Sequence, residues 1–206
     1  MKDALHDIRE QYYKQKKGTV TVVNVPPMNF IRIEGSGDPN TEASFSDAVS
    51  LLYKFSYTIK FMMKKKIKQI LYSVMPLEGL WWADDMNDFT VEKKNAWKWS
   101  MMIMQPGFIT HEDYLRAAEQ ITETSKQRNP LLGMQKFGEF HEGPAAQILH
   151  CGRYEDEGPT VGTLHAFISD NGYSLCGKHH EIYFGDPRRQ KPASMKTILR
   201  QPIRKK

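Results

Sequence analysis

The sequence is poor in cysteine and contains no long apolar run, and these two absences exclude several classes of protein. Its 206 residues include only Cys151 and Cys176, too few for a disulfide framework. No stretch approaches the roughly 20 apolar residues of a membrane-spanning helix. The first residues, 1–4, carry no apolar signal core. We therefore expect a cytoplasmic protein in a reducing environment, without membrane contact.

Residues that could hold a metal are also scarce. Cys176, His179 and His180 lie close together in the sequence, but one cysteine without a second Cys/His pair does not match the spacing of a zinc site. Cys176 is better interpreted as a small buried hydrophobe. We predict no metal and no cofactor.

Positive charge is present in excess but is not arranged as a nucleic-acid surface. The net charge is +5, and its clusters are residues 64–68, 188–191 and 204–206. These fall at a predicted helix end, in a loop and in a tail. Lysines at a helix C-terminus complement the helix dipole, which explains the first cluster without a partner. We do not expect direct binding to nucleic acid.

Hydrophobic periodicity and turn residues divide the first half into alternating helices and strands. The predicted elements are a helix at 3–16, strands at 19–23 and 28–34, a helix from about Thr41 to the basic run, a strand at 70–82, a polar loop at 84–94, a strand at 97–104 and a helix from Thr110 to about 126. Thr110 with Asp113 three residues on is close to a capping box.

The second half repeats this order. Its predicted elements are a strand at 145–151, a loop at 152–159, a helix at 160–168 and strands at 179–184 and 195–203. We therefore predict an α+β fold with two strand-helix-strand-strand modules, at about 19–127 and 137–206. They would be related by a pseudo-twofold axis and share one antiparallel sheet, so that residues 1–206 form a single domain.

Each module carries one glutamate within an apolar, aromatic strand: Glu78 in residues 75–84 and Glu181 in residues 179–184. A carboxylate among aromatic rings is desolvated, which raises its pKa unless a partner holds it ionised. Edge strands also carry single charges that prevent aggregation. The pattern thus leaves a pocket role and a solvated charge both open.

Residues 77–82 (LEGLWW) and 180–189 (HEIYFGDPRR) resemble motifs of the stand-alone GyrI-like small-molecule-binding proteins, and the likeness extends from about residue 20 to 203. The resemblance implies a duplicated strand-helix-strand-strand module with a ligand cleft at the junction. Related regulators use a buried glutamate to hold cationic aromatic drugs. Some stand-alone members hydrolyse the cyclopropane ring of DNA-alkylating compounds of the yatakemycin and duocarmycin type.

The residue chemistry suits a planar aromatic ligand. Aromatic side chains offer flat walls, and a glutamate could attract a cation or take a proton from water aimed at a strained ring carbon. A tyrosine hydroxyl or a protonated Glu78 could donate to the oxygen that gains charge. The predicted catalytic residues are Glu181, Glu78 and Tyr72, and the predicted ligand-binding residues are Trp81, Trp82, Trp97, Trp99, Tyr183 and His180.

Three functions remain open on the sequence. The first is a detoxifying or self-protecting hydrolase of planar cyclopropanoids. The second is a non-catalytic protein that binds or sequesters drugs, and the third is a gyrase-inhibitor-like protein that contacts gyrase. For each tryptophan, core packing is as good an explanation as ligand contact. For Tyr154, Tyr173 and His165, packing in the core or a loop is the better explanation.

Overall fold

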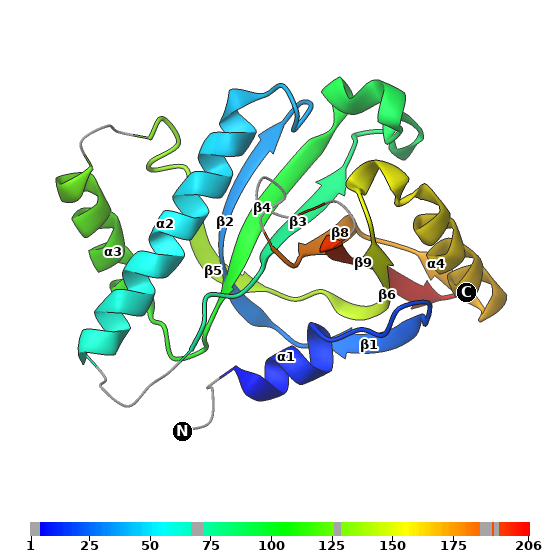
Figure 1. The fold of residues 1–206 in the computed structure, drawn as a ribbon, viewed down its shortest axis with the longest axis horizontal. Coiled ribbons are helices and arrows are strands. Elements are labelled where there is room, and N and C mark those ends of the chain that lie inside the picture. Colours follow the sequence, from blue (N-terminus) through cyan, green and yellow to red (C-terminus); the bar gives the residue numbers. More distant parts are fainter. Residues whose placement is uncertain (1–4, 67–71, 126–128, 186–190, 192–193) are drawn as a thin grey trace. The chain divides into compact units, whose positions relative to one another are not determined.

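A computed structural model describes residues 5–66, 72–125, 129–185, 191 and 194–206 (Figure 1). The start of the strand predicted at 70–82 and residues 186–189 of the second motif lie outside the described residues. The chain forms two compact units. Unit 1 comprises residues 1–7, 28–77 and 82–140, and unit 2 comprises residues 8–27, 78–81 and 141–206.

Within the described residues, strands are interleaved with four α-helices and three short 3₁₀ helices. In chain order they are α1 (His6–Tyr12), β1 (Thr21–Val25), β2 (Met28–Ser36), α2 (Ala43–Lys66), β3 (Leu77–Trp82), η1 (Met86–Asp88), η2 (Val91–Ala96), β4 (Lys98–Gln105), α3 (His111–Thr124), β5 (Lys136–Phe140), β6 (Gly143–Cys151), η3 (Tyr154–Asp156), α4 (Gly158–Asp170), β7 (Tyr173–Leu175), β8 (His179–Tyr183) and β9 (Lys196–Lys205).

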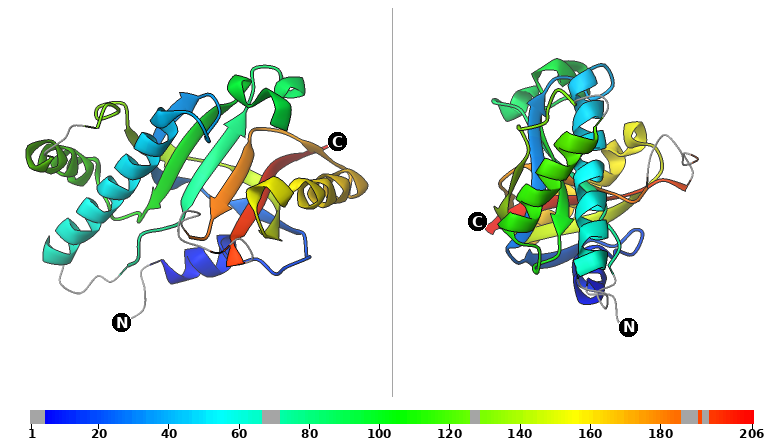
Figure 2. Two further views of the ribbon diagram at one scale, coloured as in Figure 1. Left: turned by 45° about the horizontal axis from the view of Figure 1, so that its top comes forward. Right: turned by 90° about the vertical axis from the view of Figure 1, so that its left-hand side faces the viewer.

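In unit 1, β2 lies between β4 and β5, and both pairings are antiparallel. Helix α2 packs on β2 and β4 and also contacts α3; Figure 2 shows the two helices side by side. Apolar residues of α2 recur every three or four positions and bury one face of the helix, as Leu52, Phe55 and Ile59 do. Three lysines in its last turn complement the helix dipole, as the sequence indicated.

Helix α3 begins with the predicted cap. The Thr110 side chain accepts a hydrogen bond from the Asp113 backbone N–H, and the Asp113 carboxylate accepts one from the Thr110 backbone N–H. Each side chain thus accepts a hydrogen bond from a backbone N–H that has no partner within the helix. The capping box is confirmed.

In unit 2, the strands are ordered β1-β6-β9-β8, and residues 78–81 of β3 follow β8. The pairs β1–β6, β6–β9 and β8–β9 are antiparallel, and the short β7 pairs with β9. Helix α4 packs against β6, β7 and β9. Its Leu164 and Ile168 form a buried apolar cluster with residues that include Ile148 and Leu199 of the strands.

The predicted α+β class and antiparallel pairing are confirmed. The order β2-α2-β3-β4 of the first half is followed by β6-α4-β7-β8-β9 in the second, where β7 is an additional strand. Within the residues described, no helix combines the length and the apolar character needed to cross a membrane.

Some boundaries predicted from the sequence were wrong. Residues 72–76 are not in a strand, and β3 begins only at Leu77, directly after Pro76, which has no N–H to give to a ladder. The segment predicted as a loop at 84–94 contains η1 and η2. Strands β5 and β7 were missed, because each is short and has no continuous apolar run.

Candidate functional site

Strand β8 of unit 2 carries the candidate site on both of its faces. Successive side chains of a strand point to opposite faces of the sheet. His179, Glu181 and Tyr183 therefore share one face, and His180 points to the other. All five residues of β8 are buried, so each polar side chain among them requires a partner or a ligand.

On the face of His180, the histidine ring lies between two carboxylates. Its Nδ1 is 2.7 Å from Glu142 Oε1, and its Nε2 is 3.0 Å from Glu78 Oε2. The second oxygen of Glu78 accepts a 2.7 Å hydrogen bond from the Tyr13 hydroxyl. Both oxygens of Glu78 are thus occupied as acceptors, and its side chain is fully buried.

Arg200 extends this network. Its Nη1 donates to Glu142 Oε2 at 2.9 Å and its Nε to Gln147 Oε1 at 2.9 Å. Its Nη2 donates to the backbone carbonyl of Tyr12. His180 and Arg200 are direct partners in the β8–β9 ladder, so the register of two strands places both cations beside Glu142.

The electrostatics of the network are self-consistent. Burial favours the neutral imidazole of His180, but the Glu142 carboxylate and hydrogen bonds to Glu142 and Glu78 outweigh burial and raise the histidine pKa to about 9. Burial also opposes ionisation of Glu142, yet His180 and Arg200 lower its pKa to about 2. At neutral pH the network therefore places a protonated histidine and an arginine beside the ionised Glu142.

The other face of β8 carries Glu181 next to aromatic rings. The Trp81 indole N–H donates a 2.9 Å hydrogen bond to the Tyr183 hydroxyl, and the Tyr183 ring packs edge-on against Tyr154 at 5.5 Å between centroids. Burial, the charges of Glu181 and Glu157, and a hydrogen bond with Glu181 raise the pKa of Tyr183 far above its usual value. Tyr183 is therefore a neutral hydroxyl at physiological pH.

Glu157 and His165 border this face as well. Glu157 lies at the start of α4, and one ligand atom from each of Glu157, His179 and Glu181 falls within 4.8 Å of the others. The Nε2 of His179 is 3.5 Å from Glu181 Oε1. Burial lowers the pKa of His165 on α4, and neighbouring His179 lowers it further. Two carboxylates and two imidazoles thus gather on one side of β8.

The two predicted glutamates do not meet. Glu78 bonds to His180 on one face of the unit 2 sheet, while Glu181 lies with His179 and Tyr183 on the other. Their exposure differs too: the side chain of Glu181 is 11% exposed and that of Glu78 is 0% exposed. Glu181 is the carboxylate that a dissolved ligand could reach.

Four of the predicted residues belong to unit 1. Trp99 is fully buried, and its ring packs edge-on against Phe45. Trp97 is half-buried and tilted against Phe89 at 4.7 Å, and Trp82 is half-buried at the end of β3.

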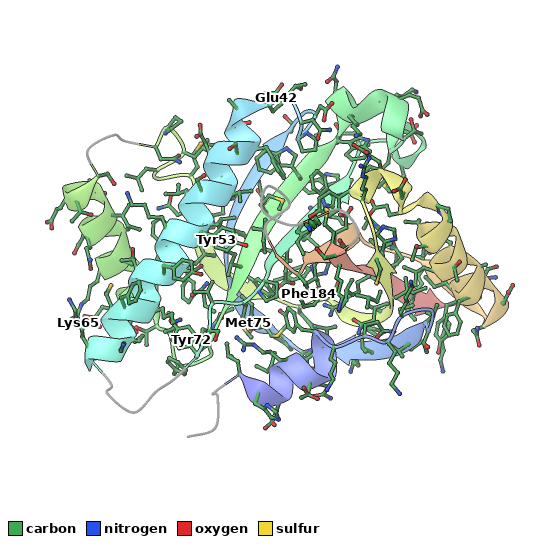
Figure 3. The ribbon with its side chains drawn as sticks, in the orientation of Figure 1. Glu42, Tyr53, Lys65, Tyr72, Met75 and Phe184 are labelled. Carbon is green, nitrogen blue, oxygen red and sulfur yellow. The ribbon has the colours of Figure 1, made fainter. Side chains whose placement is uncertain are left out.

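Tyr72, the fourth, lies on the segment before β3, close to Met75 (Figure 3). Its hydroxyl is buried without a hydrogen-bond partner among the residues described, and burial raises its pKa well above the usual value. The predicted residues in unit 2 are instead Glu78, Trp81, His180, Glu181 and Tyr183.

Sequence reasoning missed Tyr13, Glu142, Glu157 and Arg200, and it considered His179 only as a possible metal ligand. Arg200 could have been identified, because it is a charged residue within the apolar run of β9, as Glu181 is within that of β8. No such pattern marks Glu142, because it precedes Gly143 and Pro144 and its surroundings are typical of a turn. Tyr13 and Glu157 reach the strands from distant segments, which periodicity does not reveal.

Unit 2 thus carries a buried polar network on one face of β8 and a nearly buried carboxylate beside aromatic rings on the other. The family model of the GyrI-like small molecule binding domain matches residues 18–204, and the chain belongs to this family. A comparison with curated proteins gave no match.

Several solved structures are similar to this chain over most of its length. An uncharacterised conserved protein from Listeria innocua is 33% identical, with a TM-score of 0.85 over 99% of this chain and 100% of that one. A hydrolase from Listeria innocua is also 33% identical, with a TM-score of 0.81 over the same shares. The C-terminal domain of EcmrR, 14% identical with a TM-score of 0.55 over 91% of this chain and 98% of that one, shares the fold.

Proposed function

We propose that this protein is a hydrolase of planar cyclopropanoid compounds, with Glu181 as the base that activates water. The observation that carries the proposal is the position of Glu181: a slightly exposed carboxylate beside Tyr183 and His179, on the face that also holds Trp81. The similarity to a protein named as a hydrolase supports a hydrolytic role.

In the proposed reaction, Glu181 accepts a proton from water as the water oxygen bonds to the cyclopropane methylene. The ring carbon–carbon bond breaks, and its electron pair passes through the dienone to the carbonyl oxygen. That oxygen takes up a proton and becomes a phenol. The products contain the substrate plus one water. The Tyr183 hydroxyl accepts a hydrogen bond from Trp81 and bonds to Glu181, so it holds the carboxylate in position for the attacking water.

Glu78 and His180 have a different role in this proposal. Since both oxygens of Glu78 already accept hydrogen bonds and its side chain is fully buried, it is an orienting group and not a donor to the substrate. The network on that face holds β3 and β8 in register. Trp81 and Tyr183, on the same two strands, are fixed by this register on the side of Glu181.

The decisive experiment incubates the protein with a duocarmycin-type cyclopropanoid in ¹⁸O-water and detects the ring-opened, water-added product by mass spectrometry. Glu181→Gln keeps the shape but removes the proton acceptor, so kcat should fall by roughly 10²–10⁴-fold. Glu155→Gln, which changes an exposed glutamate of the same unit, is the matched control and should leave kcat unchanged. Wild-type turnover retained in Glu181→Gln would refute the base assignment.

A second function, binding without turnover, is favoured by the family itself, which is described as small-molecule binding. Stoichiometric binding of a planar ligand, seen as a change in tryptophan fluorescence with no product formed, would support sequestration. The gyrase-contact alternative would be supported by co-purification of gyrase with the protein. A planar aromatic ligand remains the expectation under the first two functions.

A further inference from the structure

We propose that the outer face of α2 binds single-stranded nucleic acid, with its aromatic rings stacked on bases and its lysines beside the phosphates. The proposal goes beyond the hydrolase function and does not depend on it. The outer face comprises Tyr53, Tyr57, Lys60, Phe61 and Lys64, which recur every three or four positions and therefore lie on one side of the helix.

Two of the rings on this face are exposed, although large apolar rings are usually buried. Phe61 is 57% exposed and Tyr57 is 46% exposed, whereas Phe55 and Ile59, on the opposite side of α2, are fully buried. The packing of unit 1 therefore explains one side of the helix and not the other. Exposed apolar groups that lie together on a surface are typical of an interaction site.

The rings of the outer face form a stacked series. The ring centroids of Tyr53 and Tyr57 are 6.4 Å apart and their planes are 29° from parallel; for Tyr57 and Phe61 the values are 6.4 Å and 27°. Bases stack at intervals of about 3.4 Å, so a base between two rings needs roughly 6.8 Å. Because the observed spacing is close to this value, successive bases of a single strand can stack on successive rings.

Positive charge lies beside these rings. The Nζ of Lys60 is 6.0 Å from the centroid of the Tyr57 ring, a distance at which the ring attracts a cation. Lys64 and Lys65, one turn further on, are exposed. Residues 53–66 contain no aspartate or glutamate. The helix therefore combines stacked rings with cations, as surfaces that bind single strands do.

The chemistry of the outer face selects the ligand. In a duplex the faces of the bases are covered by their neighbours, so the rings can reach them only in a single strand. Residues 53–66 contain no Asn, Gln or Arg, the side chains that most often read base edges, so binding should tolerate any sequence. The positive clusters of the sequence did not by themselves indicate nucleic acid; the rings among the lysines are the added observation.

The test uses the full chain without an affinity tag and a fluorescein-labelled oligothymidylate as the probe. At low salt the anisotropy of the probe should rise as protein is added. Unlabelled single strand should displace the probe, and a duplex of the same length should displace it much less. Tyr57→Ala and Phe61→Ala should each weaken binding by roughly 5–150-fold, the usual effect of removing one stacked ring.

Salt dependence separates the two kinds of contact. In a plot of log affinity against log salt concentration, each phosphate neutralised on a single strand contributes a slope of about −0.7. Lys64→Gln should therefore make the slope shallower by about 0.7. Phe61→Ala should lower the affinity and leave the slope unchanged, because a ring neutralises no phosphate.

Two matched variants control for general effects. Leu115→Ala removes part of a side chain of α3 that is 47% exposed, and Lys205→Gln removes one positive charge from the exposed end of β9. Both should keep the wild-type affinity and slope. Circular dichroism checks that each variant is folded.

Three results would overturn the proposal: no binding of the single strand by the wild type, losses in Tyr57→Ala and Phe61→Ala no larger than in Leu115→Ala, or equal displacement by the duplex. A dimer that dissociates in Phe61→Ala, seen by sedimentation in a protein that binds no oligothymidylate, would also overturn it. The outer face would then belong to a contact with a second copy of the chain.

Discussion

Raising the pH above neutrality should destabilise this protein through His180, by an amount that follows from its surroundings. The pKa of His180 is about 9 in the folded protein against an ordinary 6.5, a difference of 2.5 pH units. At about 1.4 kcal/mol per unit, the protonated ring stabilises the fold by roughly 3–4 kcal/mol. Because the folded-state pKa is raised, this contribution is complete below pH 6.5 and is lost as the pH rises through 9.

Glu142 limits the same network on the acid side. Its pKa is lowered from 4.5 to about 2, so its stabilising contribution is complete above pH 4.5 and is lost as the pH falls through 2. Both shifts arise largely from one ion pair and are not added together. The network is therefore most stabilising between about pH 4.5 and 6.5.

Urea unfolding at pH values from 5 to 10 measures this directly, and NMR titration of the His180 ring gives its pKa. In His180→Gln the alkaline loss of stability should disappear. The unfolding free energy at pH 6 should drop by about 3–5 kcal/mol, because carboxylates remain buried without their partner. His150→Gln, at a buried histidine whose ring nitrogens bond to the Thr160 hydroxyl and the Arg153 carbonyl, should keep the alkaline slope. A His180 pKa near 6.5, or the same slope in His180→Gln, would refute the reasoning.

Two further predictions concern unit 1. Gly35→Ala should lower the unfolding free energy by about 1–3 kcal/mol, since the added Cβ would lie 2.3 Å from the buried Trp99 ring. The control is Gly138→Ala, where a Cβ meets nothing within 4 Å. Equal losses of unfolding free energy in urea titrations of the two variants would contradict the packing argument. Thr110→Ala should cost about 1 kcal/mol because Asp113 loses both hydrogen bonds with the Thr110 side chain, and an unchanged midpoint of thermal unfolding would show that the cap contributes nothing.

The sequence predicted most of the fold because its signals are local. Periodicity located α2 and the core strands, and the Thr110 cap located the start of α3. Short strands such as β5 were missed, since a half-exposed run of five residues carries little pattern. The strand predicted at 70–82 begins only after Pro76, at Leu77.

The site was only partly predictable for a related reason. Glu78 and Glu181 stood out as single charges in apolar runs, but their partners come from segments far away in the sequence. Tyr13 is 65 residues from Glu78, and Glu142 is 38 residues from His180. The spacing of residues in a motif does not show on which face of the sheet each side chain lies. It therefore does not show whether two residues on different strands share a face. Glu78 and Glu181 were both predicted as catalytic residues, but they lie on opposite faces of the unit 2 sheet.

The position of β9 has a consequence for how the protein is made. This strand follows the other strands of unit 2 in the sequence, yet it lies between β6 and β8 in the sheet. It also supplies Arg200, whose guanidinium binds the carbonyl of Tyr12, 188 residues earlier. During synthesis on the ribosome, β6 and β8 emerge without the strand that separates them, and Glu142 emerges without its arginine. Unit 2 must therefore complete its sheet after translation of β9, through long-range contacts of the kind that fold slowly. Until then its strand edges are open to pairing with other chains.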